Sequence, residues 1–152
     1  FLDNPLVVVA PPDHPLVGEK NIPLARIAEE RFLSREPGSG TRQARTRLFA
    51  QHGLTANTYM ELGSSEAIKQ AVMAGLGISV LSRHNLRLEL ENGLLAILDV
   101  EHFPLVRQWY AVHLKGKKLS HTTRRFLDFL LRDGARFWEN ALTHGMDRNA
   151  RN

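Results

Sequence analysis

The sequence predicts an α/β fold with a mainly parallel sheet. Strand-like and helix-like segments alternate along most of the 152 residues, an order typical of this class. The segment LVVVA at 6–10 is a continuous apolar run, which is typical of a strand buried on both faces of a parallel sheet. Apolar residues make up 43% and charged residues 24%, as in ordinary globular proteins. No apolar run is long enough to predict a membrane span.

Local patterns place each element in chain order. Pro11 and Pro12 end the first strand, and Pro23 is tolerated in the first turn of the first helix. A turn rich in Gly and Pro at 37–40 precedes the second helix, and Gly53 stops that helix. The expected strands are 6–10, 31–35, 58–62, 78–81, 95–100 and 108–114. The expected helices are 21–30, 41–52, 66–75, 83–91 and one from about 120 to beyond 138.

Charge is distributed unevenly along the chain. The net charge is +4, but residues 1–114 carry −1 and residues 115–152 carry +5. Lys115, Lys117 and Lys118 flank an expected turn at Gly116. A basic cluster beside a terminal helix is more often a solvated face than a nucleic-acid footprint, so it does not predict DNA binding by these residues. The absence of cysteine fits a reducing compartment, and the cytoplasm is the expected location.

The segment REPGSGTR, residues 35–42, lies where a strand is expected to pass into a helix. The first N–H groups of a helix lack intrahelical partners and carry partial positive charge, and glycines such as Gly40 let a ligand approach the backbone. Ser39 and Thr41 add hydroxyl groups, and Arg42 adds a guanidinium suited to phosphate or carboxylate. Together they predict an anion-binding cradle. The alternative is that Ser39 only caps the helix and the glycines only turn the chain.

A second junction, ELGSSE at 61–66, has similar chemistry. Gly63, Ser64 and Ser65 lie at another expected helix start, but the carboxylate of Glu66 in the first turn would compete with a bound anion. An ordinary helix cap by one of the serines is therefore favoured here. Two such junctions in one parallel sheet would lie at the same edge and could share a ligand.

Motifs for catalysis and for metal or nucleotide binding are absent from the sequence. The chain has no Walker-type loop, no G-x-S-x-G, no cysteine and no histidine pair at H-x-x-x-H spacing. We therefore expect no catalytic residue, no metal and no cofactor. Trp109 and Tyr110 are expected in mid-strand on opposite faces, so that one belongs to the core and the other could line a cleft.

Four segments in order resemble the effector-binding domain of LysR-type transcriptional regulators. The matching segments are NPLVVVA (4–10) with DHPL (13–16), EPGSGTR (36–42), ELGSSEAIK (61–69) and AGLGISVL (74–81). The resemblance covers about residues 4–132. Within the family, REPGSGTR, AIKQAV (67–72) and LSRH (81–84) are most similar to regulators of RuBisCO operons.

The resemblance implies a type II periplasmic-binding-protein-like fold, in which an effector lies in a cleft between two α/β subdomains. It implies that residues 5–106 form one complete effector-binding subdomain and that residues 107–150 return to a second, incomplete one. The N-terminal winged helix-turn-helix and the start of that incomplete subdomain are expected to be absent. The implied partner is a small anionic, phosphorylated metabolite, and promoter DNA would be bound only through the absent domain. The implied effector-binding residues are Ser39, Gly40, Thr41, Arg42, Gly63, Ser64, Ser65, Trp109 and Tyr110.

Two other classes remain open on the sequence. The first is a solute-binding protein of a transport system, and the second is a prephenate-dehydratase-like enzyme on the same fold. An enzyme would need an acid or base beside the anion site, and the candidates, Glu61 and Glu66, are not placed for that role.

The expected long helix carries a broad apolar stripe with a period near 3.6 residues. Its members are Phe126, Leu127, Leu130, Leu131, Phe137 and Trp138. We expect this stripe to pack against a second copy of the chain, giving a homo-oligomer, or against a retained piece of the absent segment. The alternative is an ordinary core helix of a complete one-domain protein.

Overall fold

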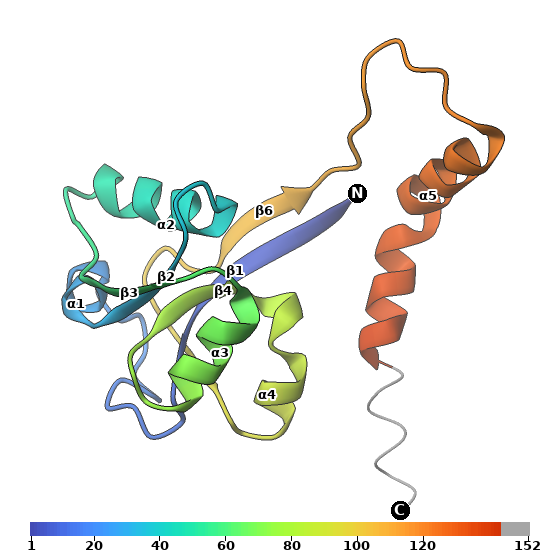
Figure 1. Cartoon of the computed structure of the whole chain (residues 1–152). Helices are drawn as coiled ribbons and strands as arrows, with labels where there is room; N and C mark the ends of the chain where they lie inside the picture. The colour runs from blue at the N-terminus through green and yellow to red at the C-terminus, as the bar shows by residue number, and fades with distance from the viewer. Residues whose placement is uncertain (144–152) are drawn as a thin grey trace, which may run out of the picture. The chain divides into compact units, whose positions relative to one another are not determined.

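The computed structural model describes residues 1–143, which form two compact units (Figure 1). The larger unit is Asn4–Arg107, and the smaller combines Phe1–Asp3 with the chain from Gln108 onward. The division falls close to the expected boundary between 5–106 and 107–150. That these units are the two subdomains of a cleft stays a prediction.

The larger unit is built on strands that form two sheets, and the start of the first strand and the end of the last belong to the smaller unit. The strands are β1 (Leu2–Ala10), β2 (Phe32–Arg35), β3 (Thr58–Leu62), β4 (Ser79–Ser82), β5 (Ala96–Leu98) and β6 (Leu105–Trp109). One sheet has the strand order β4-β1-β5, with β6 also paired to β1, and the other sheet pairs β2 with β3. Ile78 links the two sheets: its N–H donates to the carbonyl of Arg31, and its carbonyl accepts from the N–H of Leu33, each at 2.9 Å.

Helices cover both faces of these strands. They are α1 (Leu24–Glu29), α2 (Gly40–Gln51), α3 (Ser65–Met73), the single 3-10 turn Arg83–Asn85 and α4 (Arg87–Glu91). Phe32 and Phe49 belong to the core beneath α1 and α2, whereas Ile68 and Val72 belong to the core beneath α3 and α4. Figure 1 shows α2 on one side of the sheet and α3 with α4 on the other. All the helices expected in this unit are therefore present.

The expectation of a mainly parallel sheet is correct for β2 with β3 and wrong for β1. β1 runs antiparallel to both β4 and β5. Its side chains alternate between the two cores, with Val8 in one and Val7 and Val9 in the other. Burial on both faces selects a continuous apolar run whichever way the neighbouring strands point. The run 6–10 therefore indicates burial correctly but carries no information on strand direction.

The smaller unit contains the long helix α5 (His121–Thr143). The expected strand at 108–114 is wrong, because β6 ends at Trp109 and residues 110–120 form neither helix nor strand. The amino group of Phe1 donates to the carbonyl of Trp109 at 2.7 Å, so the first residue of the chain lies beside the end of β6. Between Tyr110 and Thr143 the described chain contains no strand residue. β-Branched and aromatic residues alone do not make a strand where no neighbour is present.

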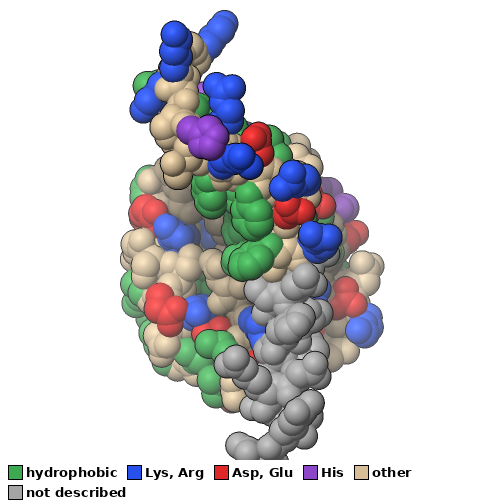
Figure 2. All heavy atoms as spheres, turned by 90° about the vertical axis from the view of Figure 1, so that its right-hand side faces the viewer, with side chains coloured by type: hydrophobic (Ala, Val, Ile, Leu, Met, Phe, Trp, Pro, Cys, Tyr) green, Lys and Arg blue, Asp and Glu red, His purple; other side chains and the backbone are tan. Residues whose placement is uncertain are grey.

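The apolar stripe of α5 is covered only in part by its own unit. Leu127, Leu130 and Trp138 are half-buried, and the Trp138 ring meets the Trp109 ring edge-on at 5.7 Å. Phe126 and Phe137 are 60% and 62% exposed. Figure 2 shows hydrophobic side chains exposed on this face and basic ones on the loop above it. What covers the exposed part of the stripe stays a prediction. No helix among residues 1–143 is long and apolar enough to cross a bilayer.

Candidate functional site

The two strand-to-helix junctions singled out by the sequence meet at one edge of the β2–β3 ladder. The strands are parallel, and Arg35 at the end of β2 pairs with Leu62 at the end of β3. The Arg35 guanidinium donates from Nη1 to the Ser65 hydroxyl at 2.9 Å, which joins the first junction to the start of α3. The expectation that both junctions lie at the same edge is therefore confirmed.

The start of α2 is left without a side-chain cap. Ser39 occupies the N-cap position, but its hydroxyl makes no capping hydrogen bond, and no acidic residue lies in the first turn. The backbone reaches this point through Gly38, whose φ of +94° is a conformation that other residues rarely adopt. The Ser39 N–H closes the turn by donating to the Glu36 carbonyl at 3.2 Å. The alternative that Ser39 only caps the helix is therefore not what the structure shows.

The start of α3 differs, because the chain caps it. The Ser64 hydroxyl accepts from the Ala67 N–H at 3.1 Å, and Glu66 lies in the first turn. The favoured interpretation of this junction, an ordinary cap, is therefore confirmed for Ser64. Gly63 is exposed with open space around it, and Ser65 accepts the hydrogen bond from Arg35. Effector binding by these three residues stays a prediction.

Two arginine–carboxylate pairs organise the charges around the site. Arg35 binds Glu36 through two hydrogen bonds, from Nε at 2.7 Å and Nη2 at 2.9 Å, which lower the pKa of the Glu36 carboxyl below its ordinary value. Arg42 donates from Nη1 to Glu61 Oε1 at 2.5 Å and to the carbonyl of Arg35 at 3.0 Å. The Arg42 side chain, predicted to bind an anion, therefore holds a carboxylate of its own chain and remains about 25% exposed.

Arg45 is a site residue that sequence reasoning missed. It is only 5% exposed, its guanidinium lies 5.0 Å above the Phe32 ring, and its buried Nε has no hydrogen-bond partner in the described chain. Burial lowers the pKa of Arg45, the charge of Arg42 lowers it further, and the charge of Glu61 raises it. The sequence did contain a signal, since Arg45 lies four residues before Phe49 on the apolar face of α2, where a cation is unexpected.

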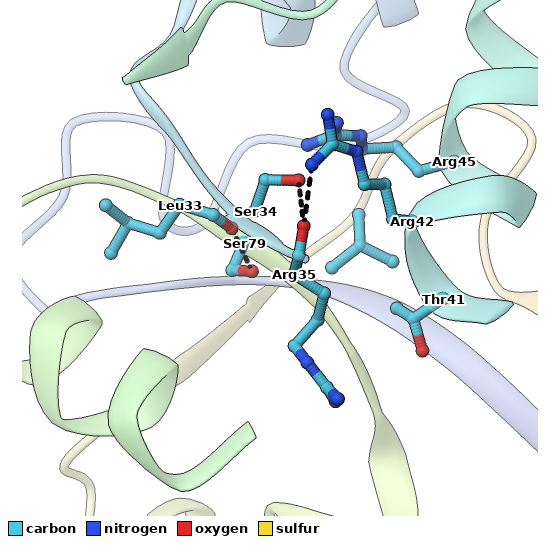
Figure 3. Close-up of a pocket in the computed structure, with 8 residues that line it drawn as sticks. Leu33, Ser34, Arg35, Thr41, Arg42, Arg45 and Ser79 are labelled. Atoms are coloured by element: carbon cyan, nitrogen blue, oxygen red, sulfur yellow. Dashed lines mark hydrogen bonds between the residues drawn. The ribbon is translucent and has the colours of Figure 1, made fainter. Parts of the chain in front are cut away.

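These residues line a small pocket between α2 and strands β2 and β4 (Figure 3). Its lining residues are Leu33, Ser34, Arg35, Thr41, Arg42, Arg45, Ser79 and Val80. The volume is about 10 Å³, which is room for one water molecule. The hydroxyls of Ser34 and Ser79 donate to the carbonyls of Arg35 and Leu33. The pocket is therefore too small to enclose a metabolite.

Three other residues lie on β6 or directly after it. Arg107, on β6, donates from Nη1 to the carbonyl of Gly40, a contact that the sequence did not predict. Trp109 is the last residue of β6 and contacts Trp138, whereas Tyr110 is 71% exposed and donates to Gln108 Oε1 at 3.0 Å. Both aromatic residues belong to the smaller unit, and their part in effector binding stays a prediction.

Comparison with known proteins defines the class. The family model of the LysR substrate binding domain matches residues 1–135, and the chain belongs to this family. The RuBisCO operon transcriptional regulators of Allochromatium vinosum and Acidithiobacillus ferrooxidans are 56% and 55% identical to it, over 136 and 130 residues. These alignments cover 90% and 86% of this chain but 45% and 42% of the relatives. The chain thus spans less than half of their length.

Two solved structures are similar in fold. The regulatory domain of CcmR from Synechocystis PCC6803, in complex with 2-PG, is 53% identical with a TM-score of 0.81, covering 86% of this chain and 62% of that one. The effector-binding domain of QuiR, in complex with shikimate, is 26% identical with a TM-score of 0.77, covering 88% and 62%. The fold is thus the type II periplasmic-binding-protein-like fold of LysR effector-binding domains. The relatives are transcriptional regulators and not enzymes, which decides against the transport and enzyme alternatives.

Proposed function

We propose that this chain is the ligand-sensing domain of a LysR-type regulator of a RuBisCO operon, and that the start of α2 binds the anionic group of a small phosphorylated metabolite. The observation that carries the proposal is the uncapped, acid-free start of α2 beside Thr41 and Arg42. It is supported by the 53% identity to a domain that binds 2-PG, 2-phosphoglycolate. A phosphate group at a helix start is stabilised by free N–H groups and by the helix dipole.

The other predicted residues belong to the same proposal. Gly63, Ser64 and Ser65 would form a second wall beside the α2 loop, to which the hydrogen bond from Arg35 to Ser65 joins them. Trp109 and Tyr110 would contribute from the smaller unit. The region of the regulator outside this chain would supply the rest of the cleft, because the relatives are more than twice as long as the aligned segment.

The whole regulator would act on promoter DNA through a domain outside this chain. We also propose that it works in the cytoplasm, where bacterial promoter DNA lies, and that it is a homo-oligomer. The exposed part of the α5 stripe, including Phe126 and Phe137, supports an interface with a second copy.

Titration of the full-length regulator with 2-phosphoglycolate tests the effector site. Thr41→Val and Arg42→Ala each remove a hydrogen-bond partner of the anion and should weaken binding by about 1.5–3 kcal/mol, roughly 10- to 150-fold in Kd. Isothermal titration calorimetry measures the loss. Thr46→Val and Arg47→Ala are matched controls, since both residues are exposed on the same helix and lie outside the pocket lining. Unchanged affinity in both test variants would contradict the proposal.

A further inference from the structure

The charges around the α2 site do not cancel. Arg35 is matched by the two hydrogen bonds to Glu36. Arg42 and Arg45 lie three residues apart on one face of α2, and Glu61 is the carboxylate that stabilises both. One carboxylate therefore serves the guanidinium groups of Arg42 and Arg45, which leaves one positive charge of these three groups in excess, and the Arg107 guanidinium at the Gly40 carbonyl adds another.

The excess charge lies on the more buried of the two arginines. Arg45 is 5% exposed and has a buried Nε without a partner, whereas the Arg42 side chain is 25% exposed. Desolvating a cation without a hydrogen-bonded counterion is costly, and an apolar side chain of similar volume is commonly as stable or more stable at such a position. Packing alone therefore does not explain an arginine beneath α2.

The two arginines also differ in what they can reach. Figure 3 shows both side chains extending from α2 toward the end of β2, where Arg42 binds the carbonyl of Arg35. Arg42 belongs to the first turn of α2, next to Thr41 at the mouth of the pocket. Arg45 is one turn further along and is held beneath the helix against Phe32. Only Arg42 can turn toward a ligand without unpacking the core.

Given the proposed function of this site, we infer that Arg45 is a positioning residue that keeps Glu61 compensated when Arg42 turns from Glu61 to the bound anion. In the free protein Arg42 is held by Glu61. When Arg42 turns to the ligand, the Glu61 carboxylate would be left unpaired, and the neighbouring Arg45 cation replaces its partner. The excess positive charge and the positive end of α2 together then suit a phosphate monoester, which carries about −1.5 to −2 at pH 7, better than a carboxylate.

A double-mutant cycle on the full-length regulator tests this role, with 2-phosphoglycolate as the ligand. Arg45→Met should weaken binding about tenfold, because the Glu61 carboxylate is then left without a neighbouring cation when Arg42 turns to the ligand. Glu61→Gln releases Arg42 and should bind as well as wild type or better. In the Glu61→Gln background the loss from Arg45→Met should shrink to less than about threefold, because no carboxylate then needs a replacement partner. Arg47→Met, an exposed arginine on the same helix, should bind like wild type.

The outcomes separate this inference from the proposed function. If wild-type regulator does not bind 2-phosphoglycolate, both fail. If wild type binds and Arg45→Met binds equally well, or loses the same factor with and without Glu61→Gln, only the role of Arg45 fails. Arg45→Lys retains the charge and should bind within about threefold of wild type; a tenfold loss there would show that shape and not charge matters, and would overturn the inference. Thermal unfolding should show Arg45→Met at least as stable as wild type, which excludes misfolding as the cause.

Discussion

The starts of α2 and α3 lie side by side at one edge of the β2–β3 ladder, yet only the start of α3 is capped by a side chain. At α3 the Ser64 hydroxyl caps the helix, Glu66 complements the dipole, and Lys69 is held between two carboxylates. At α2 the Ser39 hydroxyl caps nothing, and Arg42 places a positive charge in the first turn, where the dipole disfavours it. The chain's own side chains provide a hydrogen-bond acceptor and a negative charge for the N–H groups at the start of α3, but provide neither at the start of α2.

Under the proposed function, this difference separates a helix start that the chain itself stabilises from one that is open to a ligand. The local rules for capping and helix charge hold at α3 and are broken at α2, where Arg45 is also a buried cation without a hydrogen-bonded counterion. Proteins commonly break such rules at functional sites and recover the stability elsewhere. The contrast implies that removing the cap or the charge partners of α3 should lower the free energy of unfolding, whereas substitutions at the start of α2 should mainly change ligand affinity.

The largest expected effect on stability comes from Lys69. Its ammonium binds Glu66 at 2.8 Å and Glu89 at 2.7 Å, and the side chains of Lys69 and Glu89 are each 11% exposed. Lys69→Met would leave the Glu89 carboxylate buried without its counterion. The loss should be large because Glu89 Oε2 has no hydrogen-bond partner in the described chain. We expect a loss of about 3 kcal/mol in the free energy of unfolding, measured by urea denaturation.

The matched change at the other helix is Arg45→Met, which also removes a buried cation. It should change the free energy of unfolding little or not at all, because Glu61 keeps its hydrogen bond to Arg42 and no buried carboxylate loses its partner. Similar losses for Lys69→Met and Arg45→Met would break the distinction between the two helix starts.

The second effect is smaller and concerns the two serines at the N-cap positions. Ser64→Ala removes the hydrogen bond to the Ala67 N–H and should lower the free energy of unfolding by about 1 kcal/mol. Ser39→Ala removes no capping bond and should change stability by no more than a few tenths of a kcal/mol. Thermal unfolding of the two single variants measures both values. A loss at Ser39 as large as that at Ser64 would show that both hydroxyls are structural.

The sequence predicted more of the fold than of the site, for identifiable physical reasons. Helix positions follow from periodicity and end signals, so α2 and α3 were predicted to within a few residues. The direction of β1 and the end of β6 depend on neighbouring strands that lie far away in the sequence, and local patterns do not report them. The same limit applies to the partners of Arg42 and Arg35, since Glu61 and Ser65 lie 19 and 30 residues further along the chain.

Arg45 is a different case, because its signal was present. A charged residue on the apolar face of an amphipathic helix conflicts with the pattern around it, and such a conflict is itself evidence for a special role. The motif REPGSGTR ends at Arg42, one turn before Arg45 on the same helix. The position of Arg45 on the apolar face of α2 is therefore a feature of the sequence alone, unlike the partners of Arg35 and Arg42.

The smallest expected effect is the response of the two helix starts to acid. The pKa of Glu66 is lowered by hydrogen bonds from Lys69 and Gln70, and the pKa of Glu36 is lowered by those from Arg35. A carboxyl whose pKa is lower in the folded state binds fewer protons there than in the unfolded chain. Its stabilising contribution is therefore complete above the ordinary value of 4.5 and is lost as pH falls through the lowered folded pKa.

The stabilising contributions of Glu66 at α3 and of Glu36 at α2 should therefore both fall below about pH 4.5, even though only α3 has a side-chain cap. Urea denaturation between pH 3 and pH 6 should show the free energy of unfolding falling with acid in wild type, and less steeply in Glu66→Gln and in Glu36→Gln. The change should be small, because both carboxyls lie at the surface and water screens their pairing. An unchanged slope in both variants would mean that these ion pairs do not persist in solution. If only Glu66→Gln flattened the slope, the Arg35–Glu36 pair would not persist in solution, whereas the Glu66–Lys69 pair would.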